Sequence, residues 1–464
     1  MSSKIRSPFR NTPPIRLIVL SFMLVILTGT ILLIFPFCSR SGSFTAPIDA
    51  LFVATSATCV TGLSPFDTWT HWNEVGQLII ILLIQVGGLG LVTFTTGVTL
   101  LLRRKMGLKE LRLAVENTNG ESGLIRHLIR ITLGFTFSCE LLGALLLMIR
   151  FVPIYGPYGV WISVFTAISA FCNAGFDILG LSDPGRSLIP YVSDPLVCIT
   201  VGTLLVVGGL GFVVISDIFY AKIRPHLLHQ DHVHRLSLQS KLVIYCSATL
   251  LLVGAILFFF LEDHNTLEGL SLGAKINASF FQSASARTAG FSSVHIASEL
   301  DITKIVTILF MFIGASPGST GGGIKTTTFV VLLFTVISVL HNKSYTVIQH
   351  HRVSQHIVYR SLAICSVAIL TIILTTCVIT FCDPINGVDA LFESTSAFAT
   401  VGLSADVTSR LTFWSKLALS FTMYLGRVGP VSLGLSMLLH RHKPQDKDTI
   451  RTDCIMPEAK ISVG

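Results

Sequence analysis

Four short segments of this chain are near copies of one another, and each is centred on a glycine. They read Val60-Thr61-Gly62, Asn173-Ala174-Gly175, Thr288-Ala289-Gly290 and Thr400-Val401-Gly402. The glycines are 113, 115 and 112 residues apart (62 to 175, 175 to 290, 290 to 402), which is too long a period for a solenoid. The spacing predicts four equivalent modules around one axis. Backbone carbonyls of four such segments meeting at an axis would replace the water shell of a cation.

Glycine is the residue type that this chemistry needs at the centre of each segment. Successive carbonyls face an axis only when the backbone leaves its usual conformations, and glycine reaches positive φ without steric cost. Each segment also follows a run of small residues, which read ATSATC, AISAFC, QSASAR and STSAFA. A single glycine would indicate only close helix packing. Because four occur in phase, we interpret the triplets as filter segments, and we call them filters one to four.

The composition predicts a membrane protein. Hydrophobic residues make up 51% of the chain and charged residues 12%. A helical crossing needs about 20 mostly apolar residues. The first apolar run is too long, and too soon followed by another, to be a cleaved signal peptide. Eight runs qualify as spans, at residues 15–37, 75–102, 131–151, 196–223, 242–261, 302–340 (interrupted), 362–381 and 412–440.

The distribution of charge predicts the orientation. Lys and Arg gather in the two tails and in the loops 103–130, 222–241 and 341–360, whereas most acidic residues lie in the other loops. Basic loops face the cytoplasm, so both termini are expected there and the filters are expected near the outer side. The net charge of +8 then reflects basic residues near anionic lipid and does not call for a nucleic acid partner.

Each module has the same order of elements: a spanning helix, a short helix, a filter and a second spanning helix. The short helices at 46–58, 159–171, 271–286 and 387–398 cannot cross a bilayer, so we expect re-entrant pore helices that point their partial negative ends at the pore. The predicted fold is an all-α polytopic membrane protein with four helix–pore-loop–helix repeats around a pseudo-fourfold pore. The divisions are a tail at 1–14, modules at 15–105, 106–225, 226–342 and 343–440, and a tail at 441–464.

The second helices carry glycine motifs that are also in phase. Residues 87–90 and 208–211 both read GGLG, which favours close packing in modules one and two. In module three, residues 314–325 hold Pro317 and several glycines and cannot form a continuous helix. This stretch predicts a movable loop below the filters. A phosphate-binding loop is excluded, because Ile324 and not glycine precedes the lysine. The candidate gate residues are Gly314, Gly318, Ser319, Thr320, Gly321, Gly322, Gly323 and Lys325.

Arg427 completes the candidate gate. It lies in the second helix of module four, mid-helix by the predicted span, at the position that matches the loop of module three. A charge at this depth is costly and normally faces the protein interior or water. A purely structural pairing is the alternative. We favour a role facing the pore, where a fixed positive charge raises a barrier to cations.

Other ionisable residues give weaker signals. Asp67 and Asp177, with Asp389 and Glu393, are candidates to enrich cations at an outer mouth, although ordinary surface carboxylates explain them equally well. The histidines of the loop 226–234 fit no standard metal cage, so a solvated loop that touches a partner is favoured. The intramembrane acids Glu140 and Asp217 need partners that the sequence does not identify.

These motifs together resemble the Trk/Ktr/HKT superfamily of potassium transporters. The similarity covers about residues 15–440 and includes GSTGGGIK at 318–325, Gly-Arg-Val-Gly at 426–429 and LSLQSK at 236–241. Filter four also begins like the TVGYG loops of potassium channels, although no Tyr-Gly follows. The number of spans is similar to the Ktr translocating subunit, whereas GSTGGGIK is closer to TrkH, so the subfamily stays open.

The resemblance implies a homodimer in the cell membrane that takes up potassium, with a gating loop in module three and a pore arginine in module four. Glycine in all four filters implies potassium selectivity, since some sodium-preferring members carry serine in the first filter. It also implies a separate cytosolic nucleotide-binding regulatory subunit and no organic cofactor. Sodium-selective or unselective cation transport in the same fold is the alternative. A membrane enzyme is disfavoured, because the few ionisable groups in the spans are not clustered in sequence.

Overall fold

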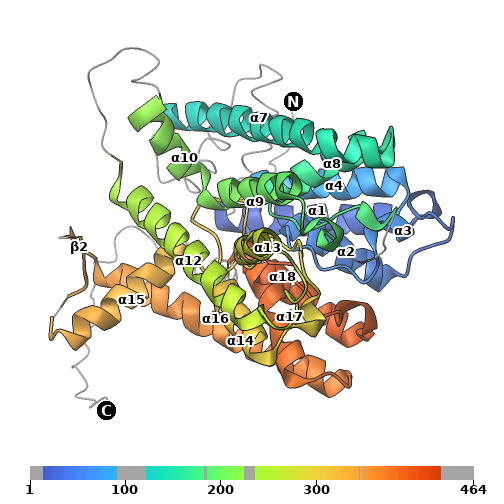
Figure 1. The fold of residues 1–464 in the computed structure, drawn as a ribbon. Coiled ribbons are helices and arrows are strands. Elements are labelled where there is room, and N and C mark those ends of the chain that lie inside the picture. The colour runs from blue at the N-terminus through green and yellow to red at the C-terminus, as the bar shows by residue number, and fades with distance from the viewer. Residues whose placement is uncertain are drawn as a thin grey trace, which may run out of the picture.

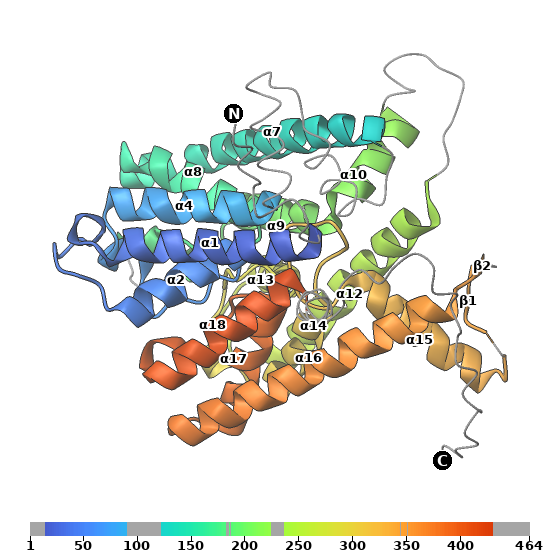
Figure 2. The ribbon, with the colours of Figure 1, turned by 180° about the vertical axis from the view of Figure 1, so that it is seen from behind.

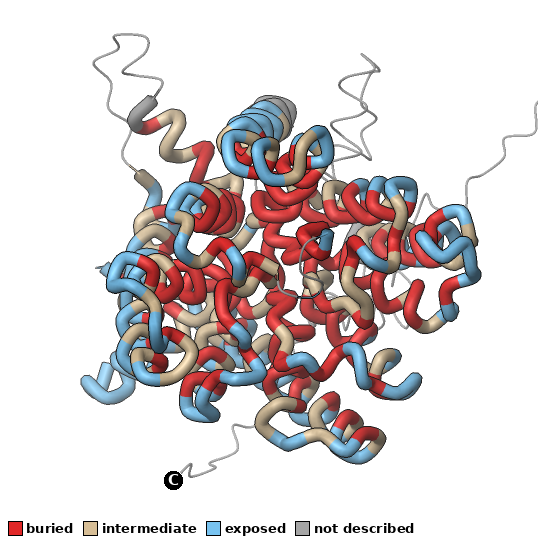
Figure 3. Tube along the Cα trace, turned by 45° about the vertical axis from the view of Figure 1, so that its right-hand side comes forward, coloured by how far each residue is buried: buried red, intermediate tan, exposed pale blue. Residues whose placement is uncertain are grey.

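The computed structural model describes residues 14–90, 122–181, 185, 187–223, 236–343, 345–349 and 351–429. Within these ranges the chain is helical, apart from connections and a small antiparallel hairpin of β1 (Val347–Ile348) and β2 (His351–Arg352). The two predicted tails, except for Pro14, and the histidine-rich loop 226–234 lie outside the described residues. Buried residues gather in the middle of the molecule and exposed ones at its periphery (Figure 3).

Four of the described helices are long and apolar enough to cross a membrane: α1 (Pro14–Ile34), α7 (Ser122–Tyr155), α12 (Leu238–Glu262) and α16 (Gln355–Cys382). Each belongs to a different predicted module. Their outward side chains are large and apolar, for example Leu24, Leu141 and Phe260, as expected for contact with lipid. Figure 2 shows α7 along one edge of the bundle and α16 along the opposite edge, with α13 between them.

The four predicted short helices are present, each with both ends within one residue of the prediction: α2 (Pro47–Cys59), α8 (Tyr158–Phe171), α13 (Leu272–Ser285) and α17 (Gly387–Ala399). They are labelled in Figure 1. Their last turns consist of small or apolar buried residues, which permit close approach to neighbouring helices. Each short helix ends directly before, or within three residues of, a filter.

The second helices are shorter than predicted, and three of them end at corresponding points, directly before a glycine. The four helices are α4 (Glu74–Leu89), α9 (Pro195–Leu210), α14 (Asp301–Phe312) and α18 (Phe413–Val428). Gly90, Gly211 and Gly429 follow three of them with φ of 77°, 90° and 90°, a conformation that ends a helix and that favours glycine.

The break predicted in module three is therefore joined by a bend in module two that the sequence did not indicate. After α9 the chain bends by 94° into α10 (Phe212–Ile218) and a π-helical stretch, Phe219–Ile223. With this bent pair counted as one span, five spans are recognised by length and composition in the described part of the chain. In module three, α15 (Thr326–Leu340) follows the predicted loop.

The remaining elements are short and belong to the connections. They are η2 (Pro36–Cys38), α3 (Thr68–His71), η3 (Leu179–Leu181), η4 (Ile189–Tyr191), η6 (Ile296–Ser298) and η7 (Thr408–Arg410). Polar caps determine where several longer helices begin: the side chains of Asn73, Asp194, Ser237 and Ser271 accept backbone N–H groups of α4, α9, α12 and α13.

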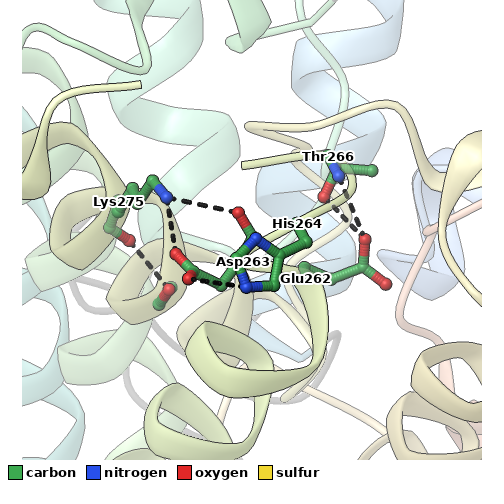
Figure 4. A network of polar contacts seen from close by, with 6 residues as sticks. Glu262, Asp263, His264, Thr266 and Lys275 are labelled. Carbon is green, nitrogen blue, oxygen red and sulfur yellow. Dashed lines mark hydrogen bonds and ion pairs between the residues drawn. The ribbon is translucent and has the colours of Figure 1, made fainter. Parts of the chain in front are cut away.

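A network of polar contacts holds the connection from α12 to α13 (Figure 4). The buried carboxylate of Glu262 accepts a hydrogen bond from the Thr266 hydroxyl. It also accepts hydrogen bonds from the Leu300 N–H and the Thr303 hydroxyl, which lie at the start of α14. Beside it, Lys275 Nζ lies 2.5 Å from Asp263 Oδ1. These contacts fix α13, and therefore filter three, relative to the two longer helices of module three.

Candidate functional site

The four filters share one backbone conformation. Their first residues, Val60, Asn173, Thr288 and Thr400, have φ of 60°, 60°, 70° and 51°. Left-handed φ is rare for β-branched residues and costs about 1–3 kcal/mol at each position. The glycine two residues later also has positive φ in every filter, at 100°, 69°, 79° and 91°. Surrounding structure must therefore impose the same strained path on all four segments.

The filters contact one another in a closed ring. A Cβ added to any filter glycine would overlap the carbonyl oxygen of the middle residue of the next filter, at 2.5, 2.8 and 2.7 Å for the first three. The fourth overlap returns from filter four to filter one and closes the ring. The pairs, in chain order, are Gly62 with Ala174, Gly175 with Ala289, Gly290 with Val401 and Gly402 with Thr61. No side chain fits at these glycines, and four equivalent carbonyls lie around one centre.

Serines of the short helices hold two of the filters in place. Ser56 Oγ accepts the Gly62 N–H at 3.0 Å, and Ser396 Oγ accepts the Gly402 N–H at 3.0 Å. The carbonyls of the same serines accept the N–H of Thr61 and Val401. Since these N–H groups face the short helix, the filter carbonyls remain free to face away from that helix. Ser56 and Ser396 were not among the residues predicted from the sequence, although both stand in the small-residue runs.

The fourth residue of each second helix contacts the short helix of the following module. Lys304 Nζ lies 2.8 Å from Asp389 Oδ1, and Lys416 Nζ lies 2.7 Å from Asp49 Oδ1. The other two junctions use neutral hydrogen bonds, between Trp161 and Gln77 and between Asn277 and Cys198. Four equivalent contacts thus join module one to two, two to three, three to four, and four back to one.

We expect replacement of Lys304 by Met to destabilise the protein by about 3 kcal/mol, because the half-buried Asp389 carboxylate loses its cation. The charge-reversed double variant, Lys304→Asp with Asp389→Lys, should recover most of that loss. Thermal unfolding of the detergent-solubilised protein measures both. Arg150→Gln is the control: Arg150 pairs with Asp194 but is 56% exposed, so its loss should cost at most about 1 kcal/mol. An unchanged unfolding temperature in Lys304→Met contradicts the prediction.

A cavity of about 250 Å³ opens on one side of the filters. Gly62, Gly175 and Gly402 line it, together with the carboxylates of Asp67, Asp177 and Asp406. Two of the four acids proposed for the mouth are therefore at the cavity. The other two are not among its lining residues: Asp389 pairs with Lys304, and the buried Glu393 accepts hydrogen bonds from Ser404 and Thr408.

Asp177 gives this cavity a pH dependence. Burial, and then the negative charge of Asp67, raise the pKa of Asp177 to about 6. The carboxyl is charged at pH 7 and becomes neutral as the pH falls through 6, so the cavity loses attraction for cations in acid. At subsaturating rubidium we expect uptake to fall by about twofold between pH 7 and 5, since the loss of one nearby unit charge screened by water weakens the attraction by on the order of 0.5 kcal/mol. Asp177→Asn should remove this dependence; a retained dependence would show that another group titrates.

The loop 314–325 lies on the other side of the filters. The Gly322 N–H donates to Thr400 Oγ1 at 2.9 Å, and a Cβ on Gly321 would overlap Thr288 Oγ1. Gly323, with φ of 67°, packs against Ala399 just before filter four. The loop therefore touches the first residues of filters three and four.

Residues 316–320 of the loop form hydrogen bonds with the second helix of module two and with the first residue of α10, which follows that helix. Ser316 and Thr320 donate their N–H groups to the carbonyls of Gly209 and Gly208 at 3.2 and 3.4 Å. Gly318, with φ of 70°, accepts the N–H of Phe212 through its carbonyl, and Ser319 Oγ donates to Ser316 O at 2.6 Å. At the base of the loop, Gly314 packs against the Gly322 carbonyl.

Two cations hold the loop. Lys325 Nζ donates to Gly321 O at 2.8 Å, within the loop itself. Arg427 donates to Thr320 O and to Gly87 O, so it joins α18 to the loop of module three and to α4 of module one. Arg427 lies in the last turn of α18 and not mid-helix as predicted, because Gly429 ends the helix. The intramembrane acid Asp217 also has its partners, the hydroxyls of Ser237 and Ser240.

The family of cation transport proteins named TrkH matches residues 3–449 of this chain. The chain belongs to this family. It is 38% identical to Ktr system potassium uptake protein B of Bacillus subtilis, over 92% of this chain and 93% of that protein. It is 35% identical to potassium/sodium uptake protein NtpJ of Enterococcus hirae, over 98% of both. The crystal structure of the potassium transporter TrkH from Vibrio parahaemolyticus has the same fold, with a TM-score of 0.69 at 17% identity over 93% of this chain and 86% of that one.

Membership of the TrkH family confirms the resemblance found in the sequence. The chain is a multi-pass membrane protein of the cell membrane and a cation transporter, and its relatives are transporters and not enzymes. Of the relatives named above, the one from Bacillus subtilis is a potassium uptake protein and the one from Enterococcus hirae is a potassium/sodium uptake protein. The family alone therefore does not decide between these two ions.

Proposed function

We propose that the protein takes up potassium across the cell membrane through a pore at the centre of four helix–pore-loop–helix repeats. The observation that carries the proposal is the closed ring of filters, in which each glycine lies against a carbonyl of the next filter. Carbonyls of residues 60–62, 173–175, 288–290 and 400–402 replace the water shell of the ion. The cavity with its three carboxylates collects cations on the outer side.

The loop 314–325 is the gate in this proposal. The contacts of Gly321 with Thr288 and of Gly322 with Thr400 support a position directly behind the filters, from which the loop would obstruct the path of the ion. Arg427 stabilises the closed position through two backbone carbonyls in different modules. Conduction then requires the loop to leave at least one of these contacts. Glycine at 318 and 323, both with positive φ, gives the backbone the freedom to do so.

Potassium is the favoured ion. Every filter has glycine at its third position, and the ring leaves no room for a side chain there. The relative from Bacillus subtilis is named a potassium uptake protein. The alternative is sodium-selective or unselective cation transport, which the potassium/sodium relative from Enterococcus hirae keeps open. Carbonyl geometry and field strength decide between them.

We also propose the arrangement in the membrane. Eight spans place both termini and the basic loops in the cytoplasm and the acidic cavity outside. Because the relatives from Bacillus subtilis and Vibrio alginolyticus are parts of a Ktr system, a separate cytosolic nucleotide-binding subunit is the proposed regulator. A homodimer is the proposed assembly, and the transported potassium needs no organic cofactor.

Rubidium uptake tests the function. The chain is expressed in cells that lack their own potassium uptake systems, with and without the regulatory subunit of the relative's system. We expect rubidium to accumulate and potassium to compete with it far better than sodium does. Equal competition by sodium would favour the unselective alternative. An absence of any rubidium or sodium uptake by protein that has reached the membrane would contradict the proposal.

A further inference from the structure

Glu140 is a buried acid in the middle of α7, a helix whose outer face exposes large apolar side chains. Its side chain is 5% exposed, whereas Leu141 and Leu142 beside it on α7 are about 60% exposed. Gln85 on α4 reaches across from module one and donates its amide Nε2 to both carboxylate oxygens, at 3.0 and 3.3 Å. A buried carboxyl group is retained at such a depth only at a cost, which makes a functional role the default hypothesis.

The contact of Glu140 and Gln85 extends to filter two through Cys172. This residue directly precedes Asn173, and its Sγ lies 3.6 Å from Gln85 Oε1 and 3.9 Å from Glu140 Oε1. Gly88, one turn further along α4 than Gln85, also packs against Cys172, since a Cβ on Gly88 would lie 2.7 Å from Sγ. Cys172 is therefore enclosed between the polar pair and a helix backbone, which leaves its side chain little freedom to turn.

Asn173 carries this constraint into the filters. It has a left-handed φ of 60°, and its Nδ2 donates to Thr288 Oγ1 at 3.3 Å. Thr288 is the first residue of filter three. A displacement of Cys172 would thus move the strained start of filter two and its hydrogen bond to filter three.

Filter two lacks the support that filters one and four receive. In those filters a serine hydroxyl of the short helix accepts the glycine N–H. The corresponding serine of filter two is Ser169, and its buried hydroxyl has no hydrogen-bond partner in the described part of the chain. Filter two therefore depends more on its other contacts, which include those of Cys172 with Gln85 and Glu140.

We propose that Glu140 is a positioning residue for ion selection. Through Gln85 and Cys172 it holds filter two in its left-handed conformation, and in this way it keeps the carbonyls of Asn173 and Ala174 in the ring. The inference depends on the proposed function, because it assigns Glu140 to the geometry of the same filters. It differs from a role in folding, since it predicts a change in ion preference at constant protein stability.

Competition by sodium against rubidium uptake tests the inference. Glu140→Leu removes both acceptors of Gln85, and we expect sodium to compete roughly tenfold better, the equivalent of one net hydrogen bond. Glu140→Gln still accepts from Gln85 and should keep the wild-type preference. Thr136→Val is the matched control: Thr136 is buried one turn earlier on α7, and its hydroxyl has no hydrogen-bond partner in the described structure, so no change in preference is expected.

Several outcomes would overturn the inference. Wild-type competition in Glu140→Leu, or an equal change in Thr136→Val, would show that α7 does not position filter two through this pair. If Glu140→Leu does not reach the membrane, Gln85→Leu tests the same contact, because it removes the amide that donates to Glu140. Failure of the proposed function looks different, since the wild-type chain itself would then take up no rubidium and both proposals would fall together.

Discussion

Replacing Gly402 by Ser is expected to lower rubidium uptake by at least about tenfold and to weaken the preference for rubidium over sodium. A Cβ at this position would overlap the carbonyl oxygen of Thr61, which belongs to the backbone of filter one and cannot turn away as a side chain does. The φ of 91° adds strain for any residue other than glycine. A cost of about 1.4 kcal/mol corresponds to a factor of ten, and the two effects together should exceed it.

The same substitution at other glycines shows whether the effect depends on the filter ring or follows from any glycine-to-serine change in this protein. Gly290→Ser should act in the same direction, because its Cβ would lie 2.7 Å from the Val401 oxygen. Gly134→Ser on the exposed face of α7 is the control, since nothing lies within 4 Å of a Cβ there. Uptake is normalised to the protein found in the membrane. Unchanged ion competition in both filter variants would contradict the assignment of the filters.

Replacing Arg427 by Gln is expected to raise rubidium uptake by roughly tenfold. The guanidinium donates to Thr320 O in the loop and to Gly87 O in α4, and hydrogen bonds from a charged group contribute about 1.5–3 kcal/mol each. Loss of even part of this energy shifts the loop toward positions that leave the path open. Loss of the fixed positive charge lowers the barrier to cations in addition. Initial rates of rubidium uptake without the regulatory subunit measure the change.

Arg427→Lys distinguishes the two contributions. Lysine keeps the charge but has no planar fork to reach two carbonyls at once, so we expect uptake between those of wild type and Arg427→Gln. Arg410→Gln is the control, because Arg410 belongs to the same module but is exposed in a connection outside the spans. A decrease of uptake in Arg427→Gln, with normal protein levels, would show that the arginine supports the open pore instead of the closed loop.

The sequence predicted the local features of the site well. Each short helix begins and ends within one residue of its expected range, and each filter glycine has the expected positive φ. Such features depend on neighbouring residues: a run of small and apolar residues forms a short helix, and glycine permits conformations that other residues avoid. The break at residues 314–325 was predicted for the same reason, since proline and glycine act on their own turn of helix.

The second helices show where this reasoning failed. The apolar runs 196–223 and 412–440 continue past Gly211 and Gly429, so length and hydropathy predicted uninterrupted spans. The structure ends a helix at both glycines, with φ of 90° at each. Glycine is tolerated within membrane helices, and its presence alone does not decide between a packing contact and a helix end. The position of Arg427 in its helix was wrong for this reason.

What the sequence alone determined is the position of the four short helices, the backbone freedom at each filter glycine and the family to which the chain belongs. Only the tertiary structure decided which charges are neutralised and which are free. Lys304 meets Asp389 across 85 residues, and Lys416 meets Asp49 across 367 residues. Glu140 finds its partner on α4, and Glu393 finds its partners in the connection that follows filter four. These contacts arise where modules close into a ring, and no local pattern of residue types encodes that closure.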